Sequence, residues 1–83
     1  MPTILYALTT EKAVGAIERQ NKLTFIVDSS ADRKKIKAEF EKMYAEKVKT
    51  VNTANDPKGN KKAYIKLARK GAASDVAAKL KIL

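Results

Sequence analysis

The chain contains no cysteine and no histidine, and each absence removes a class of function. Without cysteine, neither a disulfide nor a thiolate metal site can form. Without histidine, the commonest general base and metal ligand is missing. We therefore expect no nucleophilic or zinc-dependent catalysis, no cofactor and no small-molecule substrate. The lack of cysteine also fits a reducing compartment.

Long apolar runs are missing as well. The longest runs, such as Ile4–Leu8 and Phe25–Val27, fall far short of the roughly 20 residues that a membrane-spanning helix needs. The beginning of the sequence shows no basic region followed by a long apolar core, so we expect no secretory signal. These patterns predict a cytoplasmic protein without a membrane partner. The length of 83 residues and the hydrophobic content of 45% predict one small domain over residues 1–83.

Positive charge is what the sequence has in excess, with a formal net charge of +9. Residues 1–30 carry three bases and three acids, whereas residues 31–83 carry the other fifteen bases and six acids. This asymmetry predicts that one surface meets phosphate and another does not. The alternative is a charged surface that only keeps a small domain in solution. We favour the phosphate interpretation, because the asymmetry is larger than solubility requires.

Hydrophobic periodicity and cap residues predict the element order β-α-β-α-β-β-α. The expected strands cover residues 3–8, 23–27, 47–53 and 61–69. The expected helices run from Thr9 or Thr10 to Gln20, over residues 31–45, and over a short segment capped by Ser74. The last two strands must be antiparallel, because a short turn joins them. We predict an α+β fold in which a small, mostly antiparallel four-stranded sheet packs with the helices.

Several finer patterns make local predictions. In the strand expected at residues 23–27, Leu23, Phe25 and Val27 fall on one face, and Thr24 and Ile26 fall on the other. This alternation predicts one well-buried strand face. Val48 and Val51 are out of phase, so that strand has either two partly covered faces or a bulge. The segment Asp28–Ser30 offers cap candidates for the second helix, and Ser29 has capping-box spacing to Asp32.

All three predicted helices carry an apolar stripe, which in the first is narrow and comprises Ala13, Val14 and Ile17. In the second helix the stripe comprises Ile36, Phe40, Met43 and Tyr44. In the final helix it comprises Val76, Leu80 and Leu83. We expect these side chains to lie in the core.

The segment from Val48 to Leu67 is the most informative part of the sequence. Asp56-Pro57-Lys58-Gly59 has the residues of a type I turn, so the segment predicts a β-hairpin. Asp56 is the one acid in this segment. The segment and the residues just beyond it contain six bases, namely Lys49, Lys58, Lys61, Lys62, Lys66 and Arg69. A basic hairpin of this kind suits a polyanion. We interpret the chain as an RNA-binding module.

Alternation along the second hairpin strand places Lys62, Tyr64 and Lys66 on one face. An aromatic ring between two ammonium groups can stack on a base or sugar while the lysines neutralise phosphates. The alternative is an edge strand protected by lysines, with Tyr64 half-buried, and the pattern alone does not separate the two. At the hairpin tip, Asn55 and Asn60 accompany the lysines and can contact phosphate or a 2′-hydroxyl, although a turn can also be simply solvated.

Glu11 and Glu18 lie seven residues apart on the first predicted helix and project in similar directions. Paired carboxylates can perform acid–base chemistry, but the sequence offers no Gly-rich phosphate loop and no second catalytic group. We therefore expect no enzyme. The neutral first part of the chain is instead a candidate protein-docking face.

Four motifs occur in order along the chain: TEKA at residues 10–13, LTFIV at 23–27, VNT at 51–53 and GNKKAYIKL at 59–67. In this order they resemble large-subunit ribosomal proteins of the universal L-twenty-three family, in the short form typical of archaea. The resemblance covers residues from about 3 to 70. The pair of motifs VNT and KKAYxKL is its most specific part.

The resemblance implies a structural constituent of the large ribosomal subunit that binds large-subunit ribosomal RNA beside the polypeptide exit tunnel. It also implies three kinds of partner: that RNA, a neighbouring tunnel-rim ribosomal protein, and the signal recognition particle or other nascent-chain factors. The glutamate of the family's [ST]-E-K motif corresponds to Glu11, which we expect to dock protein together with Glu18. The loop at residues 57–60 is shorter than the extension of bacterial members, so contact with a nascent chain inside the tunnel is not expected.

Together with the residue patterns, the resemblance gives the expected RNA-binding residues: Lys12, Asn52, Thr53, Asn55, Lys58, Asn60, Lys61, Lys62, Tyr64, Lys66 and Arg69. The alternative function is a stand-alone, architectural nucleic-acid-binding protein. Such a protein would bind duplex DNA and generic RNA comparably.

Overall fold

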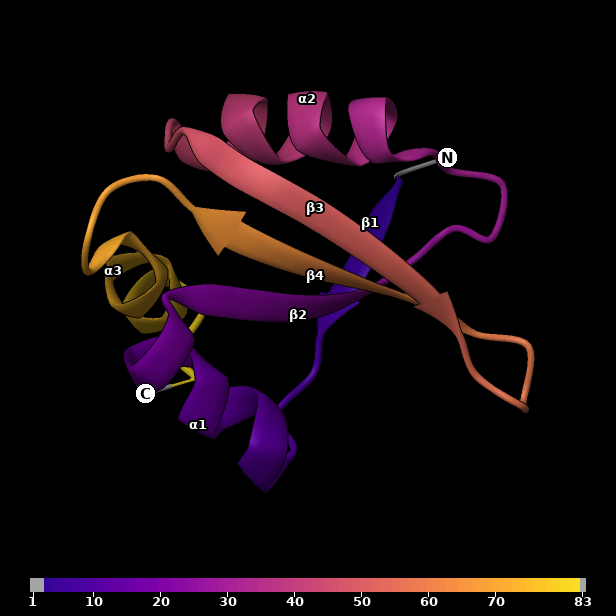
Figure 1. Ribbon diagram of the computed structural model, residues 1–83, viewed down its shortest axis with the longest axis horizontal. Coiled ribbons are helices and arrows are strands. Elements are labelled where there is room, and N and C mark those ends of the chain that lie inside the picture. The colour runs from indigo at the N-terminus through magenta and orange to yellow at the C-terminus, as the bar shows by residue number, and fades with distance from the viewer. Residues whose placement is uncertain (1–2, 83) are drawn as a thin grey trace.

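Seven elements make up the fold in the computed structural model, which describes residues 3–82 (Figure 1). They are β1 (Ile4–Ala7), α1 (Glu11–Gln20), β2 (Lys22–Val27), α2 (Arg33–Tyr44), β3 (Val48–Asn55), β4 (Lys61–Leu67) and α3 (Ala72–Lys79). The strands form one sheet in the order β1-β2-β4-β3, and all neighbouring pairs are antiparallel. The predicted α+β fold and its element order are confirmed. Within residues 3–82 no helix is long and apolar enough to cross a bilayer.

The core lies between one face of the sheet and the helices. Leu23, Phe25 and Ile65 from the central strands meet Ile36 and Phe40 of α2, and all five are buried. The rings of Phe25 and Phe40 meet edge to face with their centroids 5.8 Å apart, a geometry that aromatic pairs favour. α1 contributes Ile17 and α3 contributes Val76 to the same cluster. β1 pairs only with the second half of β2, and α1 packs beside β2 (Figure 1).

Two acidic side chains of α2 tie this helix to the two edge strands. Glu39 accepts a hydrogen bond of 2.7 Å from the backbone N–H of Ile4 in β1. Glu41 accepts one of 2.9 Å from the backbone N–H of Val48 in β3. Backbone N–H groups at sheet edges need such partners when they approach the protein interior.

The predicted cap and stripe of α2 are partly wrong. The N-cap is Asp32, whose carboxylate accepts a hydrogen bond of 2.8 Å from the N–H of Lys35, rather than a residue of the 28–30 segment. Ile36 and Phe40 are fully buried and Tyr44 is half-buried, but Met43 is 52% exposed. The three buried residues follow each other at a spacing of four, and Met43 lies about 60° from the centre of their stripe. The side of α2 that carries Met43 therefore turns away from the core.

The two predictions on individual strands have different outcomes. A register shift between Val48 and Thr50 forms a bulge that brings both Val48 and Val51 into the core, as one of the two predicted alternatives required. The prediction that β2 has a single well-buried face is wrong, because Thr24 and Ile26 are also buried. Tyr6 and Lys62 flank Ile26 in the sheet register, and their long side chains lie on the same face.

The last helix begins earlier than predicted. Gly71 is its N-cap residue, in the left-handed region with φ 83°, and Ser74 lies inside the helix. The capping hydrogen bond comes from a distant residue, since Asn21 Oδ1 accepts from the N–H of Ala73 at 2.9 Å. Val76 is buried and Leu80 is half-buried, while Leu83 lies outside the described residues.

The predicted turn closes the β3–β4 hairpin. The N–H of Gly59 donates to the carbonyl of Asp56 at 3.1 Å, and Gly59 has a φ of 87°. The Asp56 carboxylate accepts from the N–H groups of Lys58 and Asn60 at 3.0 and 2.8 Å. The hairpin loop projects beyond the rest of the molecule, at the opposite end of the sheet from α3 (Figure 1).

Candidate nucleic-acid interface

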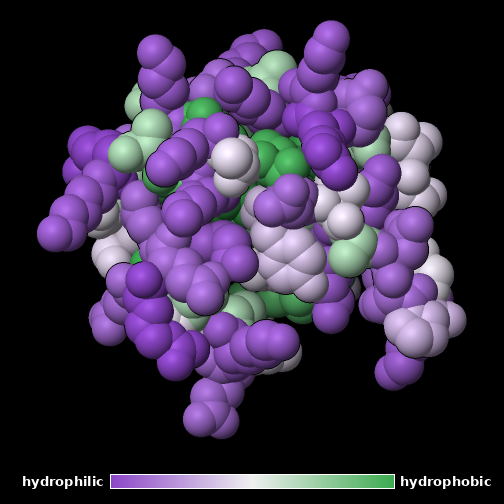
Figure 2. Space-filling model, in the orientation of Figure 1, coloured by the Kyte–Doolittle hydropathy of each residue, from purple (hydrophilic) through white to green (hydrophobic). Residues whose placement is uncertain are grey.

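One face of the sheet points away from the core, and we call it the open face. It comprises three cross-strand rows whose members pair in register: Thr50, Lys66 and Lys22; Asn52, Tyr64 and Thr24; and Ala54, Lys62 and Ile26. The side of the molecule on which β3 lies toward the viewer in Figure 1 is predominantly hydrophilic (Figure 2). The face combines lysines, an amide and an aromatic ring, which are the groups that contact phosphates and bases.

A groove of about 430 Å³ lies between α1 and the open face. We call it the α1 groove, and its lining includes Asn52, Tyr64 and the four cations Lys12, Arg19, Lys22 and Lys62. No acidic residue lines the groove within the described part of the chain. Four like charges around a concave surface create a positive potential that attracts an anion.

Tyr64 lines the groove and lies on a central strand of the sheet. Its register partners are Thr24 on β2 and Asn52 on β3, so β4 is a central strand. The alternative of a lysine-protected edge strand is therefore wrong, although Tyr64 is half-buried as that alternative expected. The ammonium group that covers the ring belongs to Lys22, at 5.4 Å from the ring centroid, a distance typical of a cation–π contact.

Arg19 and Lys22 were not predicted as site residues, because residues 1–30 have no net charge. All three bases of that segment, Lys12, Arg19 and Lys22, line the α1 groove. Its three acids do not. Alternation along β2 could have placed Lys22 and Thr24 on one face, but only the pairing of β2 with β4 brings that face next to Tyr64.

The acidic side chains are largely occupied within the chain. Asp28, Asp32, Glu39, Glu41, Glu46, Asp56 and Asp75 each accept hydrogen bonds from other residues. By contrast, the only basic side chains with hydrogen bonds inside residues 3–82 are Arg19, Lys61 and Arg69. The acids thus hold the fold together, and most of the cations remain available to an external anion.

The structure brings only some of the expected RNA-binding residues into the groove. Lys12, Asn52, Lys62 and Tyr64 line it, and Lys66 lies exposed on the open face outside it. The expected residues at the hairpin tip (Asn55, Lys58 and Asn60) are exposed and do not line the groove.

Three of the expected residues, Thr53, Asn55 and Lys61, lie on the other face of the sheet, and Asn55 pairs with Lys61 there. Thr53 pairs with the buried Ala63 and is half-buried. Lys61 pairs with Val27, and its ammonium group donates a hydrogen bond of 2.6 Å to the carbonyl of Ala31. Lys61 and Lys62 are neighbours in sequence, but their side chains point to opposite faces because a strand alternates.

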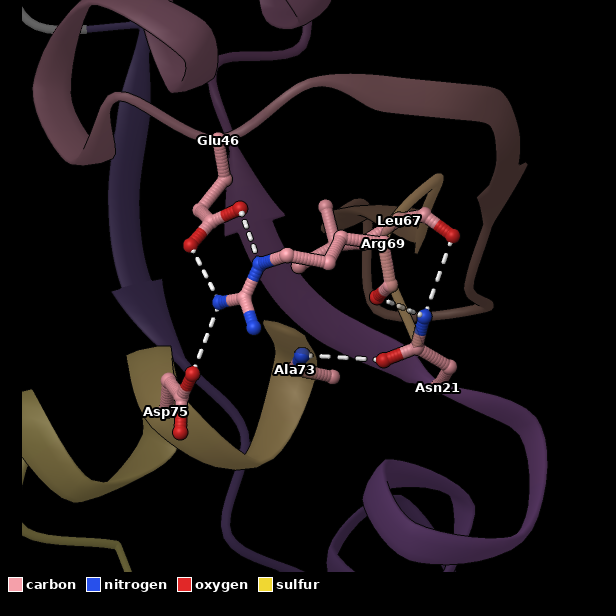
Figure 3. Close-up of polar contacts among 6 residues, drawn as sticks. All are labelled: Asn21, Glu46, Leu67, Arg69, Ala73 and Asp75. Atoms are coloured by element: carbon pink, nitrogen blue, oxygen red, sulfur yellow. Dashed lines mark hydrogen bonds and ion pairs between the residues drawn. The ribbon is translucent and has the colours of Figure 1, made fainter. Parts of the chain in front are cut away.

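Arg69 is held by two carboxylates (Figure 3). Its Nη2 atom lies 2.6 Å from Glu46 Oε2 and 2.7 Å from Asp75 Oδ2, and its Nε donates to Glu46 Oε1 at 3.3 Å. The hydrogen bond from Arg69 lowers the pKa of Glu46 below its usual value of 4.5, and both carboxylates raise the pKa of Arg69. The guanidinium group therefore joins the α2–β3 connection to α3, away from the groove.

Glu11 and Glu18 are both exposed on α1. Neither makes a side-chain hydrogen bond or ion pair among residues 3–82. Each stands next in sequence to a cation of the groove, Lys12 or Arg19, and so lies about 100° around the helix from it. α1 thus separates a cationic side, toward the groove, from an acidic side.

Comparisons with known proteins agree with one another. A model of the family described as ribosomal protein L23 matches residues 2–76. A curated relative, the large ribosomal subunit protein uL23 of Pyrobaculum aerophilum, is 46% identical over 76 residues. That alignment covers 92% of this chain and 94% of the relative.

Proposed function

The chain belongs to the ribosomal protein L23 family, and from this premise we propose that it binds large-subunit ribosomal RNA through the α1 groove and the open face. It is a structural component of the large subunit of the cytoplasmic ribosome and not an enzyme. The observation that carries the proposal is the lining of the groove by four cations and no acid. Cations from α1, β2 and β4 converge there on a half-buried tyrosine, as expected of an RNA-binding surface.

We further propose that the chain lies beside the polypeptide exit tunnel, next to another tunnel-rim protein, and forms part of the docking site for the signal recognition particle or other nascent-chain factors. The family resemblance of the TEKA motif supports this assignment. The acidic side of α1 supports it as well, because Glu11 and Glu18 are exposed and their side chains have no partner in residues 3–82. RNA on the cationic side of the helix would leave this acidic side accessible to protein.

A charge-neutralising pair of variants tests the RNA-binding surface. Arg19→Gln combined with Lys62→Gln removes two groove cations, whereas Lys42→Gln combined with Lys79→Gln removes two exposed cations of α2 and α3. Each phosphate contact contributes about 0.7 to 0.9 to the slope of log affinity against log salt concentration. For binding to large-subunit RNA, we expect the magnitude of this slope to fall by about 1.4 to 1.8 in the groove variant and to stay unchanged in the control variant. Equal slopes for both variants would contradict the proposal.

A competition experiment separates the ribosomal function from a stand-alone architectural one. Duplex DNA in equal mass should compete poorly against large-subunit RNA, and the protein should sediment with large subunits. Equal competition by duplex DNA would favour the architectural alternative.

A further inference from the structure

The α1 groove has an apolar interior as well as a cationic rim. Leu8, Ala13 and Ala16 line it together with Tyr64. Ala13 and Ala16 are small, so the wall formed by α1 leaves room in front of the ring. A volume of about 430 Å³ lies within the range of about 300–1,000 Å³ that is typical of sites for single small ligands. The groove therefore has room for a small ligand and offers it apolar as well as polar contacts.

The ring of Tyr64 is accessible from the groove. Tyr64 is half-buried on the open face and does not belong to the core cluster. The flexible end of the Lys22 side chain lies over the ring, with its ammonium nitrogen 5.4 Å from the centroid. A cation–π contact at such a site contributes about 0.5–1 kcal/mol, so a stacking ligand can displace it. The released ammonium group then remains beside the ligand, where it can meet a phosphate.

Polar groups stand where a nucleotide would need them. Lys12 and Arg19 are seven residues apart on α1, which separates them by about 10 Å along the helix axis. Cations at both ends of the groove wall can therefore meet the phosphates on either side of one base. Asn52 pairs with Tyr64 in the sheet and is exposed. Its side-chain amide has both donors and an acceptor for the edge of a base.

A continuous RNA duplex does not use these features. Its bases are paired and stacked inside, so only its backbone would reach the cations on the rim. Bases in bulges and loops can instead leave the stack and pack on aromatic side chains.

From this geometry we propose that the α1 groove is a binding site for one unstacked nucleotide of the bound RNA. The base stacks on the ring of Tyr64, and the flanking phosphates lie near Lys12, Arg19 and Lys22. This inference rests on the proposed RNA-binding function and specifies the form of RNA that the groove takes. Tyr64 supplies the stacking surface, and Lys22 covers that surface until the base arrives.

The experiment compares two RNA duplexes, each formed from two strands, at low salt. One carries a single bulged 2-aminopurine, and the other is fully paired. The protein variants are Tyr64→Leu, Tyr64→Phe and the control Met43→Ala, which shortens a 52% exposed side chain of α2 outside the groove and the open face. Affinity and 2-aminopurine fluorescence are measured for each, and far-ultraviolet circular dichroism verifies that each variant is folded.

We expect the unmodified protein to bind the bulged duplex about 5- to 150-fold more tightly than the paired one, which is the range that stacking of one base provides. Fluorescence should be quenched on binding. Tyr64→Leu should lose the preference and the quenching, while Tyr64→Phe and Met43→Ala should keep both. Equal, salt-dependent binding of both duplexes by the unmodified protein would overturn the nucleotide-binding site and leave the proposed function intact. If the unmodified protein showed no salt-dependent binding to either duplex or to large-subunit RNA, the proposed function itself would be overturned.

Discussion

The side-chain oxygen of Asn21 accepts a hydrogen bond of 2.9 Å from the backbone N–H of Ala73, 52 residues further along the chain. The same side chain donates from Nδ2 to the carbonyls of Leu67 and Arg69 at 3.1 and 2.8 Å (Figure 3). Asn21 thus ends α1 in the left-handed conformation, with φ 53°, and caps α3. One residue fixes the position of α3 relative to the helix that forms the groove wall.

Replacement of Asn21 by glycine should destabilise the protein by about 2–3 kcal/mol. Glycine accepts the left-handed backbone at this position, so the loss reports three hydrogen bonds that each contribute about 0.5–1.5 kcal/mol. Urea unfolding followed by circular dichroism measures the change. The control Asn60→Gly removes an exposed asparagine side chain at the hairpin tip and should cost much less. A stability equal to that of the unmodified protein would show that the Asn21 amide does not hold α3.

The ion pair of Arg69 with Glu46 should make stability depend on pH in the acid range. The pKa of Glu46 is lowered in the folded state, mainly by the hydrogen bond from Arg69. A lowered folded pKa means that the stabilisation is complete above the unfolded value of about 4.5 and is lost as the pH falls through the folded value. The difference in Tm between the unmodified protein and Glu46→Gln should therefore be constant from pH 7 to about 5.5 and shrink below pH 4.5. A difference that stayed constant down to pH 3 would argue against the ion pair.

Lys61 and Lys62 should respond in opposite ways to substitution by methionine. Lys61→Met removes the 2.6 Å hydrogen bond to the Ala31 carbonyl and should cost about 1–2 kcal/mol of stability. Lys62→Met should leave stability nearly unchanged and lower the salt slope of RNA binding by about 0.7 to 0.9. Urea unfolding and salt titration of RNA affinity measure the two effects. Similar losses of RNA affinity in both variants would mean that Lys61 also reaches the RNA.

Replacement of Gly15 by alanine should stabilise the protein by up to about 1 kcal/mol, because alanine favours the interior of a helix. A Cβ atom at this position would lie 2.6 Å from Arg19 Nη2, the end of a flexible side chain that can move aside. The hydrogen bond of 3.3 Å from Arg19 Nε to the Gly15 carbonyl should weaken at the same time. Thermal unfolding measures the gain. A destabilised variant would show that the guanidinium group is fixed over Gly15.

Patterns confined to neighbouring residues predicted local structure well. Thr10 caps α1, and Asp56 to Gly59 close the hairpin, because both features depend on side chains within a few residues of the backbone groups that they bind. Alternation along β4 correctly separated Lys62, Tyr64 and Lys66 from the core residues of the same strand. The errors at Ser74 and Met43 arose where a distant residue caps a helix or where packing selects one side of it.

Arg69 and Lys22 show why the residues of the candidate site could not all be predicted from the sequence. Both are bases near strand ends, and nothing in their local sequence distinguishes them. Arg69 is occupied by Asp75 and by Glu46, which lies 23 residues earlier in the chain. The pairing of β2 with β4 instead leaves the Lys22 ammonium over the ring of Tyr64. Each outcome depends on elements far apart in the chain.

The order of the elements, the basic hairpin, the family motifs and the excess of cations all follow from the sequence alone. Which cations gather at one groove and which are neutralised inside the protein depends on the fold, because the interactions involved have a short range. Hydrogen bonds and ion pairs act over a few ångströms, and the order β1-β2-β4-β3 sets which charges come within that distance.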